Sequence, residues 1–225
     1  VNNCILSGNS AGMGGGISGV VANNCTISGN SAGYSGGGVN YGTLNNCTII
    51  GNTAEVGGGT YDGTANNCTI SDNTATEEGG GMRGGAANNC TISGNSAEYG
   101  GGMRGGTANN CTISGNSAEY GGGMSFCTAN NCILSGNAAF FYGGGMEYCT
   151  ANSCTISGNS ASNYGGGMGR GTAKNCIVYG NSAPQGNNLY SATVYFSCSP
   201  DAAHGVDGNI TNAPVFVDAL NGDYR

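Results

Sequence analysis

A cysteine recurs along most of this chain at intervals of 21 or 22 residues. Its positions are Cys4, Cys25, Cys47, Cys68, Cys90, Cys111, Cys132, Cys154, Cys176 and Cys198. A fixed period of this length is typical of a solenoid, in which each repeat buries its apolar side only by stacking on its neighbours. The spacing therefore predicts about ten stacked coils, one for each cysteine.

Composition decides which kind of solenoid this is. Each unit contains a glycine run, paired asparagines and a short segment that favours β-strand, such as Cys68-Thr69-Ile70-Ser71. The 47 glycines among 225 residues exclude helical repeats, because glycine destabilises a helix. A leucine-rich repeat requires several leucines per unit, and this chain has very few. We expect an all-β fold, a right-handed parallel β-helix with one coil per unit.

Three columns of side chains are expected to point inward. Residues two apart in a strand share a face, so each ladder cysteine and the aliphatic residue two positions later both face the core, while Thr69 and Ser71 face solvent. The predicted cysteine ladder contains Cys25, Cys47, Cys68, Cys90, Cys111, Cys132 and Cys154. The third column follows the glycine run and contains Ile17, Val39, Thr60, Met82, Met103, Met124, Met146 and Met168.

An asparagine follows the cysteine by five residues in nine coils. Asparagine tolerates the left-handed backbone of a turn, and stacked amides can hydrogen-bond from coil to coil. We therefore predict an internal asparagine ladder at a corner. Its central members are Asn30, Asn52, Asn73, Asn95, Asn116, Asn137 and Asn159.

Two further cysteines, Cys127 and Cys149, lie off the ladder and are 22 residues apart. They occupy a column in which the other coils mainly have glycine, as at Gly85 and Gly106. Neighbours in adjacent coils lie within the Cα separation that a disulfide allows, so we predict a disulfide between this pair. For the ladder cysteines we expect buried thiols, since free cysteine behaves as a small apolar residue, with disulfides as the alternative.

The regular repeat predicts two parts of the chain. Residues 1–183 form regular coils, and residues 184–225, which contain all three prolines, form an irregular last coil and a C-terminal extension that caps the stack. The chain begins within a repeat, at Val1-Asn2-Asn3-Cys4, which suggests a processed product or a piece of a longer protein. An uncapped first coil also raises the hypothesis that copies associate head to tail as a filament.

Charge limits the partners. The formal net charge is −7, with only five lysines and arginines, which argues against nucleic acid and anionic membranes. No stretch resembles a signal peptide or a transmembrane span, so we expect no membrane insertion of this segment.

The pairing of Gly-Gly-Gly-Met with Ile-Ser-Gly-Asn-Ser-Ala resembles the repeat motifs of polymorphic outer membrane proteins and, more broadly, bacterial right-handed β-helix repeat proteins. The segment from Ala213 to Arg225 resembles the closing segment of choice-of-anchor surface proteins. The chain departs from these patterns by having methionine and cysteine in core columns. The resemblance implies a location outside the cell or on the bacterial surface, and it implies no ligand.

Catalysis is not expected. A glycosidase requires two carboxylates across a cleft, whereas Glu98 and Glu119 share one column, as do Arg83 and Arg104, and equivalent positions in successive coils indicate surface ladders. The single histidine, His204, lies among turn residues, and cysteines spaced one per coil cannot gather around a metal. We predict no enzyme activity, no metal site and no cofactor.

Two surfaces are candidates for binding. Aromatic residues near the glycine corner lie beside arginines and could contact sugars or a protein; the residues are Tyr99, Tyr120, Arg83, Arg104, Phe140 and Phe141. The alternative is that the tyrosines only stack on one another. Outward threonine and serine rows resemble ice-binding arrays, but Ile50, Ile133 and Tyr179 interrupt them.

These observations favour a noncatalytic extracellular scaffold, such as a surface stalk, an adhesin repeat region or a filament subunit. Its expected partners are other copies of itself, a surface polysaccharide, or a host or cell-surface protein. The second hypothesis is a β-helix that binds or cleaves carbohydrate. An ice-binding protein is the third.

Overall fold

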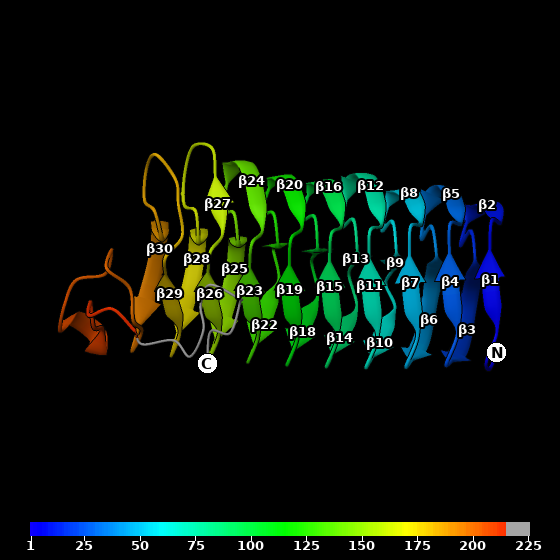
Figure 1. The fold of residues 1–225 in the computed structure, drawn as a ribbon, viewed down its shortest axis with the longest axis horizontal. Coiled ribbons are helices and arrows are strands. Elements are labelled where there is room, and N and C mark those ends of the chain that lie inside the picture. Colours follow the sequence, from blue (N-terminus) through cyan, green and yellow to red (C-terminus); the bar gives the residue numbers. More distant parts are fainter. Residues whose placement is uncertain (215–225) are drawn as a thin grey trace.

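The structure, a computed structural model, describes residues 1–214 and confirms an all-β solenoid of about nine turns. Figure 1 shows the coils stacked side by side along the longest axis, with the first coil at one end of the rod. All strand pairs are parallel and join successive coils, and those of the first and third sheets are in register, as in Ile70↔Ile92 and Met82↔Met103. The C-terminal segment that resembles choice-of-anchor proteins, from Ala213, lies almost entirely outside the described residues.

Three sheets run the length of the rod. The first sheet contains β1 (Ile5–Ser7), β4 (Thr26–Ser28), β7 (Thr48–Ile50), β11 (Thr69–Ser71), β15 (Thr91–Ser93), β19 (Thr112–Ser114), β23 (Ile133–Ser135), β26 (Thr155–Ser157) and β29 (Ile177–Tyr179). The second sheet contains β2 (Ser10–Met13), β5 (Ser31–Ser35), β8 (Thr53–Val56), β12 (Thr74–Glu78), β16 (Ser96–Tyr99), β20 (Ser117–Tyr120), β24 (Ala138–Tyr142) and β27 (Ser160–Ala161).

The third sheet has the most strands, because four of its nine coils contribute two short strands in place of one long strand. It contains β3 (Ile17–Asn23), β6 (Val39–Asn45), β9 (Thr60–Tyr61), β10 (Thr64–Asn66), β13 (Met82–Arg83), β14 (Ala86–Asn88), β17 (Met103–Arg104), β18 (Thr107–Asn109), β21 (Met124–Ser125), β22 (Thr128–Asn130), β25 (Met146–Asn152), β28 (Met168–Lys174) and β30 (Leu189–Tyr195).

Each coil bends at four residues with left-handed backbone. In one coil these positions are Asn89 (φ 54°), Gly94 (φ 66°), Gly100 (φ 66°) and Gly105 (φ 67°), and Gly106 beside the last of them is left-handed as well (φ 85°). Glycine and asparagine adopt this conformation most readily, which explains their abundance. The ladder asparagines were expected to be the left-handed residues, and this was wrong. The left-handed residue is the one before, such as Gly94, and the backbone turn there directs the amide of Asn95 inward.

The glycine run is required by close approach between coils. A Cβ atom at Gly101 would collide with the backbone carbonyl of Ser117 in the next coil. The extra residue of the 22-residue coils forms a bulge in the second sheet, where Val56 pairs with Glu78 although Ala54 pairs with Ala75. A bulge absorbs one residue without interrupting the strand pairing on either side.

The predicted inward columns are confirmed. The ladder cysteines from Cys25 to Cys176 are at most 3% exposed, and the five methionines of the third column are fully buried. Each ladder cysteine accepts a hydrogen bond at Sγ from the backbone N–H of the preceding coil's cysteine, as between Cys68 and Cys90 at 3.4 Å. Its own S–H donates to a carbonyl oxygen, as from Cys90 to Asn88 at 3.3 Å.

The asparagine ladder is also confirmed. The Oδ1 of Asn95 accepts the backbone N–H and the Nδ2 group of Asn73, each at 3.0 Å. The Nδ2 group of Asn95 in turn donates to Asn116 Oδ1 and to the carbonyl of Ile70, each at 3.0 Å. Both polar ends of every central amide are therefore used, which is the condition for burying an amide without loss of stability.

A second asparagine ladder was not predicted. It joins the residues that end the third-sheet strands, as in Asn88 Nδ2 to Asn66 Oδ1 at 2.9 Å. These side chains are half-buried, and they donate toward the N-terminal coil, whereas the inner ladder donates toward the C-terminal coil. Where two asparagines precede a ladder cysteine, the first forms this ladder and the second is the left-handed residue.

All twelve cysteines are thiols in the structure, including Cys127 and Cys149. The prediction that these two cysteines share one column is confirmed, because they occupy equivalent positions of successive coils, and both are buried. The predicted disulfide is not formed here: the backbone N–H of Cys127 donates to Cys149 Sγ at 3.2 Å, and each thiol donates to a carbonyl oxygen. This pair therefore repeats the hydrogen-bond pattern of the main ladder.

The cysteine ladder and the inner asparagine ladder both end in the last described coil. The chain was expected to become irregular at residue 184, where the second sheet ends, but β30 still pairs with β28 in register. Ser197 replaces the expected Cys198 in the cysteine ladder and accepts the N–H of Cys176 at 3.1 Å. The carboxylate of Asp201 accepts the backbone N–H groups of Asn188 and Leu189 at 2.8 and 3.0 Å, which terminates the inner asparagine ladder.

We expect Asn95→Ala to destabilise the protein by about 3 kcal/mol, because it leaves two buried donors of Asn73 and the carbonyl of Ile70 without partners. Asn109→Ala in the half-buried outer ladder is the matched control and should cost about 1 kcal/mol or less, since water can replace the lost partner. Urea unfolding followed by circular dichroism measures both. Equal costs would contradict the role of the inner ladder.

We further expect the native protein to react slowly with thiol reagents, except at the partly exposed Cys4. Burial raises the pKa of Cys47 and of Cys127, and only the thiolate is nucleophilic. After denaturation without reductant, titration should count twelve thiols. A count of ten, with Cys127 and Cys149 protected in the mass spectrum, would instead establish the disulfide.

Candidate functional site

The second and third sheets meet at the glycine run, and a groove of about 440 Å³ follows this junction along the rod. One wall is a row of tyrosines that end second-sheet strands, with Tyr99 and Tyr120 stacked at 5.0 Å between ring centroids. The opposite wall is formed by Phe126 and Tyr148, whose rings stack at 4.8 Å. We call this cavity the aromatic groove.

Local sequence explains the second wall. Phe126 and Tyr148 stand two residues after the methionine, at one of the four left-handed positions of the coil (φ 54° and 51°). The two preceding coils have Gly84 and Gly105 there. Holding a bulky residue in this conformation costs on the order of 1–3 kcal/mol, so the wall is built against backbone preference.

Two arginines bridge the walls. The guanidinium of Arg104 lies 4.6 Å from the ring centroid of Phe126 and 5.7 Å from that of Tyr99. Arg170 lies 4.3 Å from the ring of Tyr142 and 4.8 Å from that of Tyr148. Each arginine thus contacts one ring of either wall, an attraction between a cation and the negative face of an aromatic ring.

Ser125 and Glu147 form the floor between these arginines. They occupy adjacent coils in the column that follows the methionine, and their side chains are 0% and 2% exposed. Arg170 donates to Glu147 Oε1 at 2.9 Å. Among the described residues, no hydrogen-bond partner is present for Glu147 Oε2, Ser125 Oγ or the Nε of Arg104. The carboxylate extends over Gly169, where a Cβ atom would collide with Oε2.

Burial raises the pKa of Glu147 to about 7, and the attraction of Arg170 only partly opposes this effect. The other carboxylate at the groove, that of Glu78, is bound by Arg83 at 3.2 Å and Arg104 at 3.3 Å. The groove thus combines a carboxyl group that titrates near neutrality with an ion-paired carboxylate.

The structure separates the predicted surface residues into two groups. Tyr99, Tyr120 and Arg104 line the aromatic groove. Arg83 lies beyond its end, over the ring of Tyr61 at 5.4 Å. Phe141 stacks on Tyr120 at 5.0 Å, while Phe140 remains 58% exposed outside the groove. The tyrosines also stack along the rod, as the alternative hypothesis expected.

Sequence reasoning missed Ser125 and Glu147. It grouped the acidic residues as surface ladders, although aligning the coils on the methionine column shows a break. After the methionine the coils read Arg-Gly-Gly twice, then Ser-Phe-Cys, Glu-Tyr-Cys and Gly-Arg-Gly. Glu147 therefore stands where earlier coils have arginine, and the two coils that changed this residue also gained the aromatic wall and the off-ladder cysteines.

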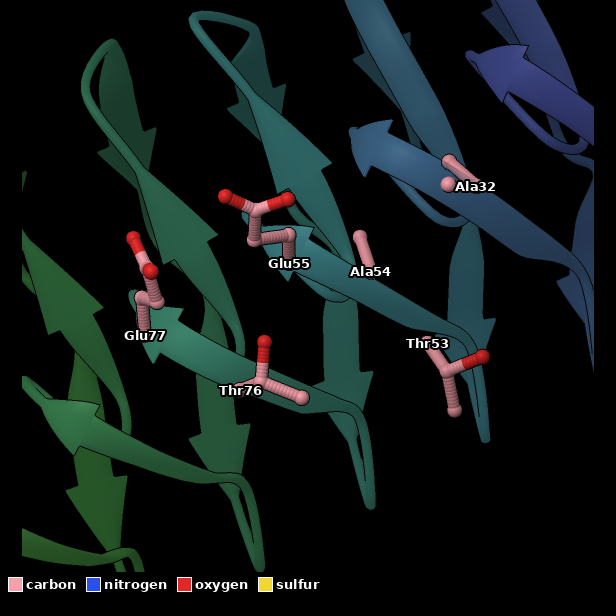
Figure 2. Close-up of a pocket in the computed structure, with 7 residues that line it drawn as sticks. Ala32, Thr53, Ala54, Glu55, Thr76 and Glu77 are labelled. Carbon is pink, nitrogen blue, oxygen red and sulfur yellow. The ribbon is translucent and has the colours of Figure 1, made fainter.

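A second, shallower groove of about 420 Å³ lies over β5, β8 and β12. Figure 2 shows Glu55 and Glu77 extending from neighbouring strands beside the small side chain of Ala54. Neither carboxylate is buried, so this surface offers no desolvated acid of the kind that a glycosidase requires.

The outward face of the first sheet has the expected threonine and serine rows with their interruptions. Ile50 pairs with Ser28 and Ser71, and Ile133 lies between Thr112 and Thr155. Within the described residues, no group of three or more potential metal ligands comes together.

Comparison with known proteins leaves the family open. The chain matches no protein-family model, no curated protein and no solved structure. Across residues 1–214, no helix has the length and apolar character needed to cross a membrane.

The raised pKa of Glu147 predicts a dependence of stability on pH. The folded state holds the proton more tightly than the unfolded state, so the contribution of Glu147 is greatest below about pH 4.5 and is lost as the pH rises to about 7. Glu147→Gln stays neutral throughout. Its stability relative to the wild type should rise by on the order of 2 kcal/mol between pH 5 and pH 8.

Urea unfolding of the wild type and Glu147→Gln at both pH values measures this difference. Glu119→Gln, at an exposed position, controls for loss of surface charge. If the difference between wild type and Glu147→Gln were the same at pH 5 and pH 8, Glu147 would not titrate in this range.

Proposed function

We propose that this protein is a noncatalytic extracellular scaffold, a rigid rod of the kind found in surface stalks and adhesins, which presents the aromatic groove on its side. One observation carries the proposal. Four buried side-chain atoms lack a hydrogen-bond partner in residues 1–214, and three of them, in Arg104, Ser125 and Glu147, lie in this groove. Native structures rarely leave such groups unpaired outside functional sites.

The rest of the rod supports a mechanical role. Coil-to-coil hydrogen bonds join the backbones, and the inner asparagine ladder uses both polar ends of each central amide. The ladder ends on the carboxylate of Asp201, which accepts hydrogen bonds. This favours contacts through the side of the rod over continuation of the ladder into another copy. A rigid rod places the groove at a fixed position, as an adhesive function requires.

A location outside the cell agrees with the chemistry of the surface. The net charge of −7 disfavours nucleic acid, and the ladder thiols are buried away from oxidants. These properties agree with the resemblance to bacterial surface repeats.

One observation favours the second candidate, a carbohydrate-cleaving enzyme. Glu147 has a pKa of about 7, which suits a general acid at neutral pH. Such an enzyme also needs a second carboxylate as base or nucleophile, and Glu78 is held by two arginines. We therefore place binding ahead of cleavage.

Electron microscopy at several concentrations, combined with an assay for new reducing ends on a polysaccharide panel, tests the proposal. We expect isolated rods of roughly 45 Å, the length of about nine turns at strand spacing, and no release of sugar. Release of reducing ends that Glu147→Gln abolishes would establish the enzyme instead. Long uniform filaments would show that the coil ends, and not the side groove, form the main interface.

A further inference from the structure

We infer that the aromatic groove binds one pyranose unit of a neutral polysaccharide, with the sugar hydroxyls paired to Ser125, Glu147 and Arg104. The inference rests on the proposed binding scaffold and names its ligand class. A groove of about 440 Å³ falls within the range of small-molecule sites, which runs from about 300 to 1,000 Å³.

The unpaired atoms of the floor define the ligand's polar groups. Arg104 Nε can only donate a hydrogen bond, ionised Glu147 Oε2 can only accept one, and Ser125 Oγ can do both. A ligand that satisfies all three must both donate and accept over a short distance. Neighbouring hydroxyl groups on a sugar ring do this, whereas an ammonium group only donates and a carboxylate only accepts.

The charges at the site favour a neutral ligand. Among the residues that line the groove, Glu78 pairs with Arg104 at 3.3 Å and Glu147 with Arg170 at 2.9 Å, so two carboxylates balance two guanidinium groups. An anionic or cationic ligand would have to displace one of these ion pairs. A hydroxyl group can join them without leaving a buried charge unpaired.

The walls present ring edges to the ligand. Stacking along the rod covers ring faces within each wall, and the arginines lie over further faces. The edges of aromatic rings carry partial positive charge, which attracts oxygen atoms. The groove is therefore a slot that holds a polyhydroxylated ring edge-on.

Arg104 lies over the floor and has to turn outward to admit the ligand, while Arg170 stays bound to Glu147 at 2.9 Å. Turning gives up the contacts of Arg104 with the rings of Phe126 and Tyr99 and its ion pair with Glu78 at 3.3 Å, which are partly exposed and therefore weak. Glu78 keeps its second partner, Arg83, at 3.2 Å. Once turned, the guanidinium can hydrogen-bond the sugar from above.

Affinity electrophoresis and calorimetry with four polymers test the inference: neutral glucan and mannan, acidic polygalacturonate and cationic chitosan. We expect the full chain to bind a neutral polymer, with little change between 50 and 300 mM salt. Salt-sensitive binding to polygalacturonate or chitosan alone would overturn the assignment of a neutral ligand.

Ser125→Ala separates binding from folding. The hydroxyl of Ser125 is buried and has no hydrogen-bond partner among residues 1–214, so its removal should leave the melting temperature unchanged or raise it. Affinity for the sugar should fall roughly five- to tenfold, the loss of one hydrogen bond. Ser114→Ala, on the outward face of the first sheet, is the control. Unchanged affinity in Ser125→Ala would overturn the assignment of the floor.

Phe126→Gly tests the wall in the same way. Other coils have glycine at this left-handed position, so the variant should fold at least as stably, yet lose sugar affinity at least tenfold. Tyr41→Gly makes the matched change at the equivalent position of a coil outside the groove and should bind normally.

The sugar site and the scaffold can fail separately. If the protein forms intact rods, cleaves no polymer and binds none of the neutral polymers, the sugar site is refuted and the proposed scaffold is not. Cleavage of a polymer would instead refute the noncatalytic function.

Discussion

Hydrogen bonding of identical groups from coil to coil is the interaction on which this structure depends. Parallel pairing in register requires each coil to return to the same position one strand spacing further along the rod. The inner asparagine ladder enforces this, because an amide such as Asn95 is fully paired only if Asn73 and Asn116 stand directly on either side of it. A slip of one residue would bury several unpaired amides at once.

The four left-handed corners make this return possible. They let a chain of only 21 or 22 residues close one turn with three short strands, and bulges in the second sheet accommodate the difference in length. The result is a core only one side chain deep from each sheet. Small and flexible groups, cysteine thiols and methionine thioethers among them, suit that narrow interior.

Against this regular background, the aromatic groove is the place where two adjacent coils give up local stability. Phe126 and Tyr148 take a left-handed backbone where glycine would be relaxed, and Ser125 and Glu147 are buried with polar atoms that no residue of the described part of the chain pairs. A rod stabilised along its whole length can tolerate such a site. The same rigidity holds the two walls and the floor in a fixed relation, which is what recognition of a ligand needs.

The amino-acid sequence alone determined the solenoid, its strand registers and its inward columns, because a repeated pattern must be satisfied in the same way in every coil. It did not determine the groove. Arg104, Ser125, Glu147 and Arg170 come from four different coils, and Arg170 stands in a different column from the other three. Only the stacking of the coils, and the meeting of the second and third sheets at the glycine run, brings these side chains between two aromatic walls. The pKa of Glu147 likewise depends on its burial there, a property of the tertiary structure that residue type and spacing do not contain.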